Sequence, residues 1–252
     1  MKNTILGLAF LICSSGSPLW VSQTYAQQNN AGATAQQKFF DSIKKGDLAK
    51  VRELLKQDPA LMKATTKSGI TPILLAVYTH QKPIADFLLV SGTELNIFEA
   101  SATGRIERVR ELLKKNPELI HAYSPDGWTA LHLNFGNVEM AKFLMDSGAD
   151  LNAVSKNKFT ATPLQGAAVN KSIEVGRLLL DRGANVNPRN DDGGIPLHEA
   201  AGNGEIEFAK LLLDHGANVN AKDDKGKTPL TIALEYKQPE MAKLLRDHGA
   251  VE

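Results

Sequence analysis

Apolar positions along most of this chain recur with the spacing of short, paired helices. Leu164, Ala167 and Ala168 stand at i, i+3 and i+4, which places them on one face of a helix. A second apolar stripe follows over residues 173–180 after a polar gap. Each stripe is too short for a helix that is stable alone, so the pattern predicts two small helices that pack together.

The residues that flank these stripes are typical of helix ends. Thr162 predicts an N-cap, and Pro163 fits the first helical turn, where its missing N–H costs nothing. Gly183 follows the second stripe, at the position where a helix commonly ends in a left-handed residue. Glycines at the matching positions of other copies are Gly148, Gly216 and Gly249.

The same sequence motif is repeated every 33 residues. Residues 163–187 and 196–220 are identical at 16 of 25 positions. Upstream, residues 46–61 match residues 104–119 at 9 of 16 positions with a shift of 58, which is one full unit plus a shortened one. Because one helix pair cannot close a core, the units must stack on one another. The phrases begin at Thr129, Thr162, Ile195 and Thr228.

Two units depart from the pattern. The third, around residues 95–116, lacks the Thr-Pro phrase and its turn. The unit that begins at Thr129 has Asn134 and Phe135 where others have two alanines, and the loop at 155–161 is longer. We therefore expect a short first helix and a local irregularity in this unit.

The N-terminal segment has a different pattern. Lys2, an apolar run over residues 5–12 and Ala26 together predict a cleaved signal peptide over residues 1–26. The run is shorter than the ~20 residues that span a bilayer. The alternatives are a lipoprotein anchored at Cys13, although Ile12 fits that poorly, and an uncleaved anchor.

Residues 27–37 carry no charge and no apolar periodicity, which predicts a flexible polar leader ahead of a folded domain over residues 38–252. An adhesive role of this leader is an alternative. We expect an exported protein, in the periplasm or, as the alternative, outside the cell, with no membrane insertion after cleavage.

Charge and cysteine content narrow the function classes. The chain has 29 Lys and Arg against 28 Asp and Glu, and removing the predicted signal peptide makes the numbers equal. Such a balance gives no basis for nucleic-acid binding. Cys13 is the single cysteine and lies in the predicted signal peptide, which excludes disulfides, thiol catalysis and cysteine-ligated zinc after cleavage.

The catalytic motifs that we considered are incomplete. Residues 198–202, His-Glu-Ala-Ala-Gly, begin like a zinc-protease helix but have Gly202 where the second histidine is required. We expect no enzyme activity, metal or cofactor. The alternative is a hydrolase or metal-dependent enzyme with its site in the irregular middle, residues 120–160.

The phrases over residues 195–201 and 211–220 resemble the ankyrin-repeat family almost throughout. The resemblance covers the chain from about Phe39 to the C-terminus and implies an all-α solenoid of about seven stacked helix pairs with β-turn finger loops. It also implies that His132 and His198, which share one repeat position, tie the turns between units. Ankyrin arrays bind many unrelated partners, so the resemblance does not identify a function.

In that family the finger tips and the short inner helices form a concave binding face. We expect Trp128 and Phe159 to be exposed aromatic anchors on it; the alternative is that each ring folds back onto its own turn. The expected function is a monomeric, non-catalytic scaffold for a protein partner, either a chaperone or maturation factor or an inhibitor; a structural role attached to the envelope through the leader is a further alternative. The candidate partner-binding residues are Tyr78, Asp126, Trp128, Lys158, Phe159, Asn170, Asp191, Asp192, Asn203, Asp224, Lys225 and Tyr236.

Overall fold

The computed structural model describes residues 34–251, which form two compact units over residues 34–95 and 96–251. The predicted signal peptide and residues 27–33 of the predicted leader lie outside the described residues. Within residues 34–251, helices are joined by turns and no strand forms, apart from one isolated bridge between Tyr123 and Thr129. The predicted all-α fold class is confirmed.

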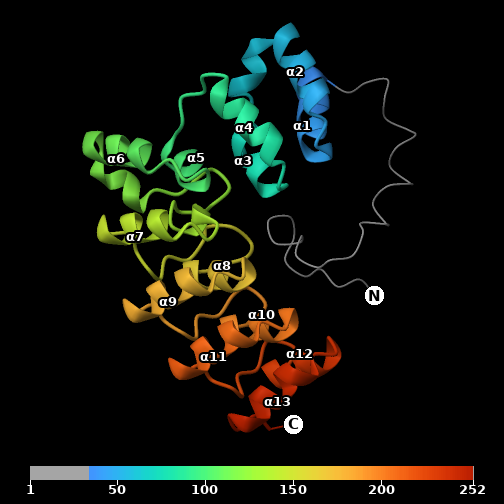
Figure 1. Cartoon of the computed structure of the whole chain (residues 1–252), viewed down its shortest axis with the longest axis vertical. Helices are drawn as coiled ribbons and strands as arrows, with labels where there is room; N and C mark the ends of the chain where they lie inside the picture. The colour runs from blue at the N-terminus through green and yellow to red at the C-terminus, as the bar shows by residue number, and fades with distance from the viewer. Residues whose placement is uncertain (1–33, 252) are drawn as a thin grey trace. The chain divides into compact units, whose positions relative to one another are not determined.

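The first unit contains two helix pairs and one short 3-10 helix. Helix α1 packs on α2 and α3, and α3 packs on α4 (Figure 1). The elements are α1 (Ala35–Lys45), α2 (Leu48–Gln57), η1 (Pro59–Lys63), α3 (Pro72–Tyr78) and α4 (Lys82–Val90).

The start of α1 corrects the predicted domain boundary. Thr34 Oγ1 accepts a hydrogen bond from the Gln37 N–H at 3.2 Å, and Gln37 Oε1 accepts one from the Thr34 N–H at 2.8 Å. This reciprocal capping box satisfies two backbone donors that a helix end leaves free. Residues 34–37 therefore belong to the folded domain, not to the leader as predicted.

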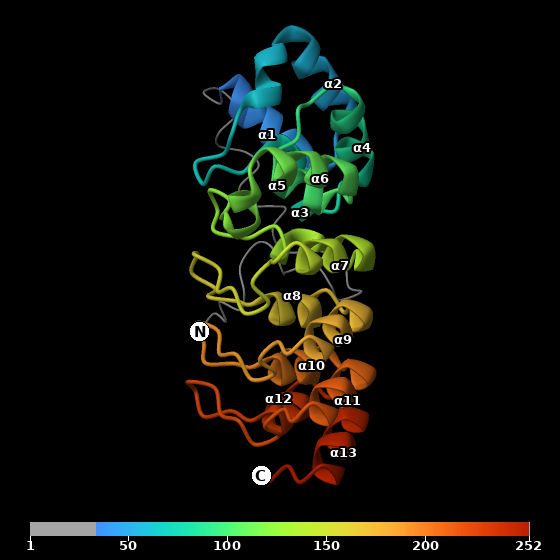
Figure 2. The ribbon, with the colours of Figure 1, turned by 90° about the vertical axis from the view of Figure 1, so that its left-hand side faces the viewer.

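In the second unit, helix pairs stack in sequence order (Figures 1 and 2). Each of the short helices α8, α10 and α12 contacts the next on one side, and each of α7, α9, α11 and α13 contacts the next in a second row. We call these the inner and outer helices. The elements are α5 (Ile97–Ala102), α6 (Ile106–Lys115), η2 (Pro117–His121), η3 (His132–Asn134), α7 (Val138–Asp146), α8 (Pro163–Val169), α9 (Ile173–Asp181), α10 (Pro196–Asn203), α11 (Ile206–Asp214), α12 (Pro229–Glu235) and α13 (Pro239–Asp247).

The core lies between inner and outer helices and between successive pairs. Leu164 and Leu197 of the inner helices and Leu179 and Leu212 of the outer helices are fully buried. These are positions that the apolar stripes predict. Full burial of one leucine contributes about 1.5–3 kcal/mol, so repetition of the stripe is what holds the stack together.

Helix ends follow the predicted signals. Thr162 caps α8 and Pro163 occupies its first turn. Gly183, after α9, has φ +87°, and a Cβ there would meet no atom within 4 Å. The requirement for glycine at this position is thus conformational, since a left-handed backbone disfavours a side chain even in open space.

The 58-residue similarity has a structural counterpart. Both η1 and η2 follow the second helix of a pair, and in each a polar side chain caps the 3-10 turn. Asp58 Oδ1 accepts the Ala60 N–H at 3.0 Å, and Asn116 Oδ1 accepts the Glu118 N–H at 3.2 Å. The two segments are copies of one unit, as their sequences predict.

The irregular unit is shortened where the sequence predicts it. Its first helix is the three-residue η3, and Phe135 follows with φ +45°. Asn134 donates its side-chain amide to the Leu131 carbonyl at 2.5 Å and accepts the Gly136 N–H at 3.0 Å. The asparagine thus replaces a helical turn with a tight polar turn.

Asparagines in the segments after the outer helices connect successive units. Asn152 accepts the Asn185 N–H at 2.8 Å, and Asn187 accepts the Asn218 N–H at 2.9 Å. The repeated asparagine therefore has a structural role, because it pairs a backbone donor in the next unit that would otherwise lack a protein partner.

Candidate partner-binding site

Four turns between helix pairs of the second unit project to one side of the stack (Figure 2). We call them the finger loops: residues 124–128, 155–161, 190–194 and 223–227. In each, the first residue donates its N–H to the last carbonyl, at 2.8–2.9 Å. The first side chain also accepts the last N–H, at 2.8–3.0 Å, from a serine, asparagine or aspartate oxygen. The serine, asparagine or aspartate at the first position therefore closes the turn through its side chain.

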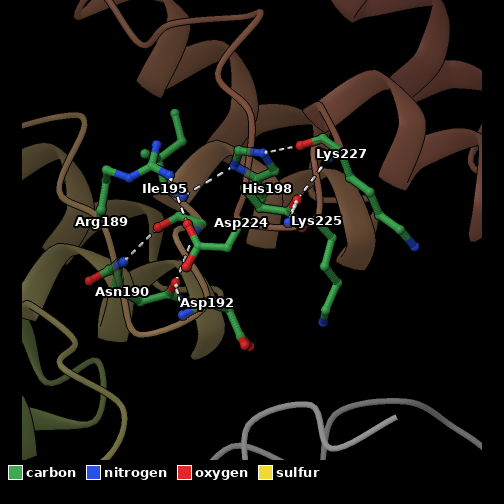
Figure 3. Close-up of polar contacts among 11 residues, drawn as sticks. Arg189, Asn190, Asp192, Ile195, His198, Asp224, Lys225 and Lys227 are labelled. Atoms are coloured by element: carbon green, nitrogen blue, oxygen red, sulfur yellow. Dashed lines mark hydrogen bonds and ion pairs between the residues drawn. The ribbon is translucent and has the colours of Figure 1, made fainter. Parts of the chain in front are cut away.

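Neighbouring finger loops are hydrogen-bonded to one another through their backbones. In each case an N–H of one loop donates to a carbonyl of the preceding loop, which fixes the spacing of the tips. Figure 3 shows Asp192 and Asp224 at one of these contacts. The bonds are Lys156 N–H to Gly127 at 2.8 Å, Asp191 N–H to Phe159 at 3.2 Å and Asp224 N–H to Asp192 at 3.0 Å.

Buried histidines tie the finger loops to the inner helices. His132 Nδ1 accepts the Thr129 N–H at 3.3 Å, so Nε2 carries the proton and donates to the Ala161 carbonyl at 2.9 Å. His198 bridges Ile195 and the carbonyl of Lys227 in the same way (Figure 3).

Burial lowers the pKa of His132 to about 4, and burial also lowers the pKa of His198. Both rings are neutral structural ties at pH 7, as the resemblance implies.

Trp128 is not an exposed anchor. Its side chain is only 4% exposed, which corrects the expectation from its turn position. The ring stacks on Phe159 of the next finger loop, with centroids 6.1 Å apart and an interplanar angle of 15°, and lies 5.4 Å from the His132 ring. The indole is covered by a neighbouring repeat, an arrangement that its own turn does not reveal.

Phe159 and Lys158 are closer to the surface. Phe159 is half-buried because one ring face covers Trp128. Lys158 is exposed, and its Nζ lies 5.0 Å from the centroid of the Phe159 ring, within cation–π range. The second finger loop therefore presents a cation above an aromatic ring.

The third finger loop is acidic and lies near a carboxylate of α10. Asp191 is exposed and Asp192 is half-buried. Partial burial and the charge of Asp192 raise the pKa of Asp191. Burial, with the charges of Asp192 and Asp191, raises the pKa of Glu199 to about 7. Glu199 was not among the predicted site residues.

The fourth finger loop is partly neutralised. Asp224 pairs with Arg189 of the preceding connection at 3.3 Å (Figure 3). Lys227 pairs with Glu235 of α12 at 2.5 Å. Lys225 is exposed, and only its backbone N–H is bonded by the loop, to Asp223. The predicted tip residues of this loop thus contribute one paired anion and one exposed cation.

The other predicted residues occupy varied environments. Asp126 is half-buried and accepts the Ser124 hydroxyl at 2.6 Å. Asn170 and Asn203 are half-buried at the ends of α8 and α10, and the Asn170 amide donates to Gly166 at 2.9 Å. Tyr236 is 49% exposed.

Tyr78 is the predicted site residue of the first unit. Its side chain is 7% exposed, and nearly every residue of the short apolar helix α3 is buried with it. Tyr78 does not lie on an accessible face as predicted.

The described residues show little of the geometry of an enzyme. No group of three or more His, Asp or Glu side chains within residues 34–251 is arranged to hold a metal ion. In the irregular middle, the two ring nitrogens of His132 are both engaged and Asp126 is bonded within its turn. In the same range, no helix has the length and apolar character needed to cross a membrane.

Comparison with known proteins is consistent with this architecture. The family model described as "Ankyrin repeats (3 copies)" matches residues 97–190 and 183–251. Ankyrin repeat and SAM domain-containing protein 6 is similar over 157 residues in Rattus norvegicus at 29% identity, and over 150 residues in Mus musculus at 39%. A putative ankyrin repeat protein of fowlpox virus is 25% identical over 162 residues.

These matches cover 62%, 59% and 60% of this chain. They cover only 15%, 14% and 36% of the length of those relatives, so they compare a repeat array and not whole proteins. The family model spans well over half of the chain, and the hydrogen-bonded finger loops and stacked helix pairs supply the matching structure. This chain belongs to the ankyrin-repeat family.

Proposed function

We propose that this protein is a non-catalytic scaffold that binds a protein partner through the face formed by its finger loops and inner helices. The observation that carries the proposal is the set of backbone hydrogen bonds between successive finger loops, reinforced by buried His132 and His198. A rigid array loses little conformational entropy on binding. Its exposed tips present Lys158, Asp191 and Lys225, which supply charges of both signs for recognition.

We further propose that the protein is exported and acts as a chaperone or maturation factor for another exported protein, or as an inhibitor. The N-terminal pattern of Lys2, the short apolar run and Ala26 supports export. Mass spectrometry of the N-terminus after fractionation would test this. A mature chain that begins near residue 27 in the periplasm or medium supports export, and an intact Met1 in the cytosol contradicts it.

Binding is tested by affinity capture with the mature chain, followed by measurement with each purified candidate. The variant Lys158→Glu/Asp191→Lys reverses charges on the finger face and keeps the net charge. Its matched control is Lys142→Glu/Glu174→Lys, which reverses exposed charges on outer helices α7 and α9. A partner lost by the first variant and retained by the control supports the proposal; equal retention by both places binding elsewhere.

An enzyme in residues 120–160 is not favoured by any observation. The side chains that would supply its chemistry, His132 and Asp126, hold the fold together. A metal or hydrolase assay that gave stoichiometric metal or turnover with the purified mature chain would overturn the non-catalytic proposal.

A further inference from the structure

The second residue of the second, third and fourth finger loops is held against the preceding loop. The backbone N–H groups of Lys156, Asp191 and Asp224 donate to carbonyls of that loop, at 2.8, 3.2 and 3.0 Å. At two of these three junctions, the side chain of this residue contacts the residue immediately before the earlier loop. Lys156 lies against Tyr123, and Asp224 lies against Arg189 (Figure 3). One repeat position therefore makes two different kinds of contact.

These two contacts differ in what happens to the charge. Asp224 Oδ1 lies 3.3 Å from Arg189 Nη2, so the two charges neutralise each other. Lys156 Nζ lies 4.1 Å from the centroid of the Tyr123 ring. The ring attracts the ammonium through its quadrupole but has no net charge, so the lysine keeps its charge and has N–H donors left for another group. The second finger loop thus carries a positioned cation where the fourth has a closed ion pair.

No acid of the described chain pairs with Lys156. The side chain is exposed and forms no ion pair within the described residues, in contrast to Lys227 of the fourth loop, which pairs with Glu235. The second loop, residues 155–161, contains no aspartate or glutamate. Asp126 of the first loop is half-buried, and its carboxylate accepts a hydroxyl hydrogen bond from its own loop at 2.6 Å. The Lys156 ammonium therefore remains available to an anion of a partner.

The cation and its ring are positioned before any partner binds. Tyr123 is joined to Thr129 by a backbone bridge at the base of the first finger loop. Asn157, the next residue after Lys156, donates its side-chain amide to the Asp126 carbonyl at 3.0 Å. The Asn157 side-chain oxygen accepts an N–H of its own loop at 3.1 Å. Because both loops are already ordered, little conformational entropy is lost when Lys156 pairs with an anion.

The positive surface is limited to this one loop. Lys158 is also exposed, and its Nζ lies 5.0 Å from the Phe159 ring centroid, so both lysine–ring contacts of the described chain occur in the second finger loop. Burial raises the pKa of Asp191 in the third loop, and the charge of Lys158 acts against this effect. Asp126 and Asp192 also lie in the flanking loops. The surface therefore suits one or two carboxylates, whereas a long polyanion would meet aspartates on both sides.

We propose that Lys156, positioned over Tyr123, forms an ion pair with a carboxylate of an acidic segment of the protein partner, and that Lys158 provides a second cation in the same loop. The ammonium donates N–H hydrogen bonds to the carboxylate, and no proton is transferred. The inference rests on the proposed function, because it names the side-chain chemistry that the partner presents to the finger loops. We therefore expect a partner that is acidic where it meets the second loop.

Substitutions separate the cation from the ring that positions it. Lys156→Gln removes the charge and should weaken binding of an acidic segment about fivefold, the upper range for an exposed ion pair. Tyr123→Leu removes the ring and should weaken binding about twofold, whereas Tyr123→Phe keeps the ring and should bind as the natural sequence does. Lys156→Arg should also retain binding, because a guanidinium pairs with a carboxylate and stacks on a ring. The matched control Lys142→Gln removes an exposed cation from α7 and should leave binding unchanged.

The test uses peptides blocked at both ends in which two glutamates flank a leucine, and matched peptides with two glutamines or two lysines in their place. Amide spectra of the mature chain and of each variant are recorded during titration with each peptide at low and high salt. We expect the glutamate peptide alone to shift the amides of residues 155–161, and this binding to weaken as salt screens the exposed pair. Unchanged amides elsewhere in the spectrum of a variant show that it is folded.

Other results would overturn the inference. Equal binding of the glutamate peptide by Lys156→Gln, or no shift in residues 155–161 with this peptide, would show that Lys156 is not an anion site. Equal weakening by Tyr123→Phe and Tyr123→Leu would contradict the positioning role of the ring. Tighter saturation by inorganic phosphate or heparin than by the peptide would assign the surface to a different anion.

A purified partner separates this inference from the proposed function. Binding that is lost in Lys158→Glu/Asp191→Lys but unchanged in Lys156→Gln contradicts the inference and leaves the proposed function intact. Binding that neither variant affects places the partner elsewhere on the chain and contradicts both.

Discussion

Trp128 and Phe159, which belong to successive finger loops, stack with their ring centroids 6.1 Å apart and nearly parallel. The stack joins two repeats at the tips, which are also joined by the hydrogen bond from the Lys156 N–H to the Gly127 carbonyl. It also explains why an aromatic residue is present in each turn without either being fully exposed.

Removing the Phe159 ring should uncover Trp128. We expect Phe159→Ala to destabilise the chain by ~1–3 kcal/mol, less than a fully buried phenylalanine, because Phe159 is only half-buried. Trp128 is the single tryptophan of residues 27–252, so acrylamide quenching reports on it alone. Quenching should be weak in the natural sequence and increase in the variant. Strong quenching before substitution would contradict the buried position.

Leu179 should be essential to the stack. It is fully buried between α9 and its neighbours, so Leu179→Ala leaves a cavity and should cost ~2–5 kcal/mol. Leu234, which is 46% exposed, provides a matched control, and Leu234→Ala should change stability far less. Denaturant midpoints measure both. Similar midpoints for the two variants would be inconsistent with the repeat packing.

His132 should make the folded chain less stable at acidic pH. Its pKa falls from 6.5 to about 4 on folding, so the unfolded chain binds more protons between these values. The contribution of this residue is complete above pH 6.5 and is lost as pH falls to about 4, by roughly 3 kcal/mol.

Gln165 provides the control for His132, because it holds the same position in the next unit. It accepts the Thr162 N–H at 2.8 Å and donates to the Gly194 carbonyl at 3.3 Å. His132→Gln should therefore keep the tie and remove this part of the pH dependence in urea titrations. An unchanged acid profile would show that His132 is not the group responsible.

Glu199 should change the stability of the chain with pH in the opposite direction to His132. Its pKa rises from 4.5 to about 7, so the folded chain binds more protons in this interval and stability decreases as pH rises through it. Glu199→Gln should stabilise the chain by about 1–3 kcal/mol at pH 8 and change little at pH 4, with the upper figure reduced by solvent at a half-buried group. A pH-independent effect would mean that the gain comes from packing.

The contributions of His132 and Glu199 to the pH dependence of stability partly cancel between pH 4.5 and 6.5. Single variants are therefore needed to observe either contribution. Comparison of His132→Gln with Glu199→Gln at pH 5 and pH 8 should therefore show changes of opposite pH dependence.

The sequence alone determined the repeat, the helix pairs and their ends. The 33-residue spacing, Thr162 with Pro163, and Gly183 act within one unit, where propensity and capping are local effects. The same local logic predicted the short first helix of the unit that begins at Thr129, which is η3. It misplaced the start of α1, because Gln37 caps Thr34 through a side chain that a polar composition does not distinguish from a flexible leader.

Tertiary structure decided what the finger face presents. Trp128 is buried by Phe159, a residue 31 positions later, and Tyr78 is buried with its helix α3. The pKa of Glu199 is raised by burial and, to a smaller extent, by the charges of Asp192 and Asp191 in a different element. Burial and charge at a repeat surface are sums over neighbouring units, so a pattern read within one unit cannot supply them.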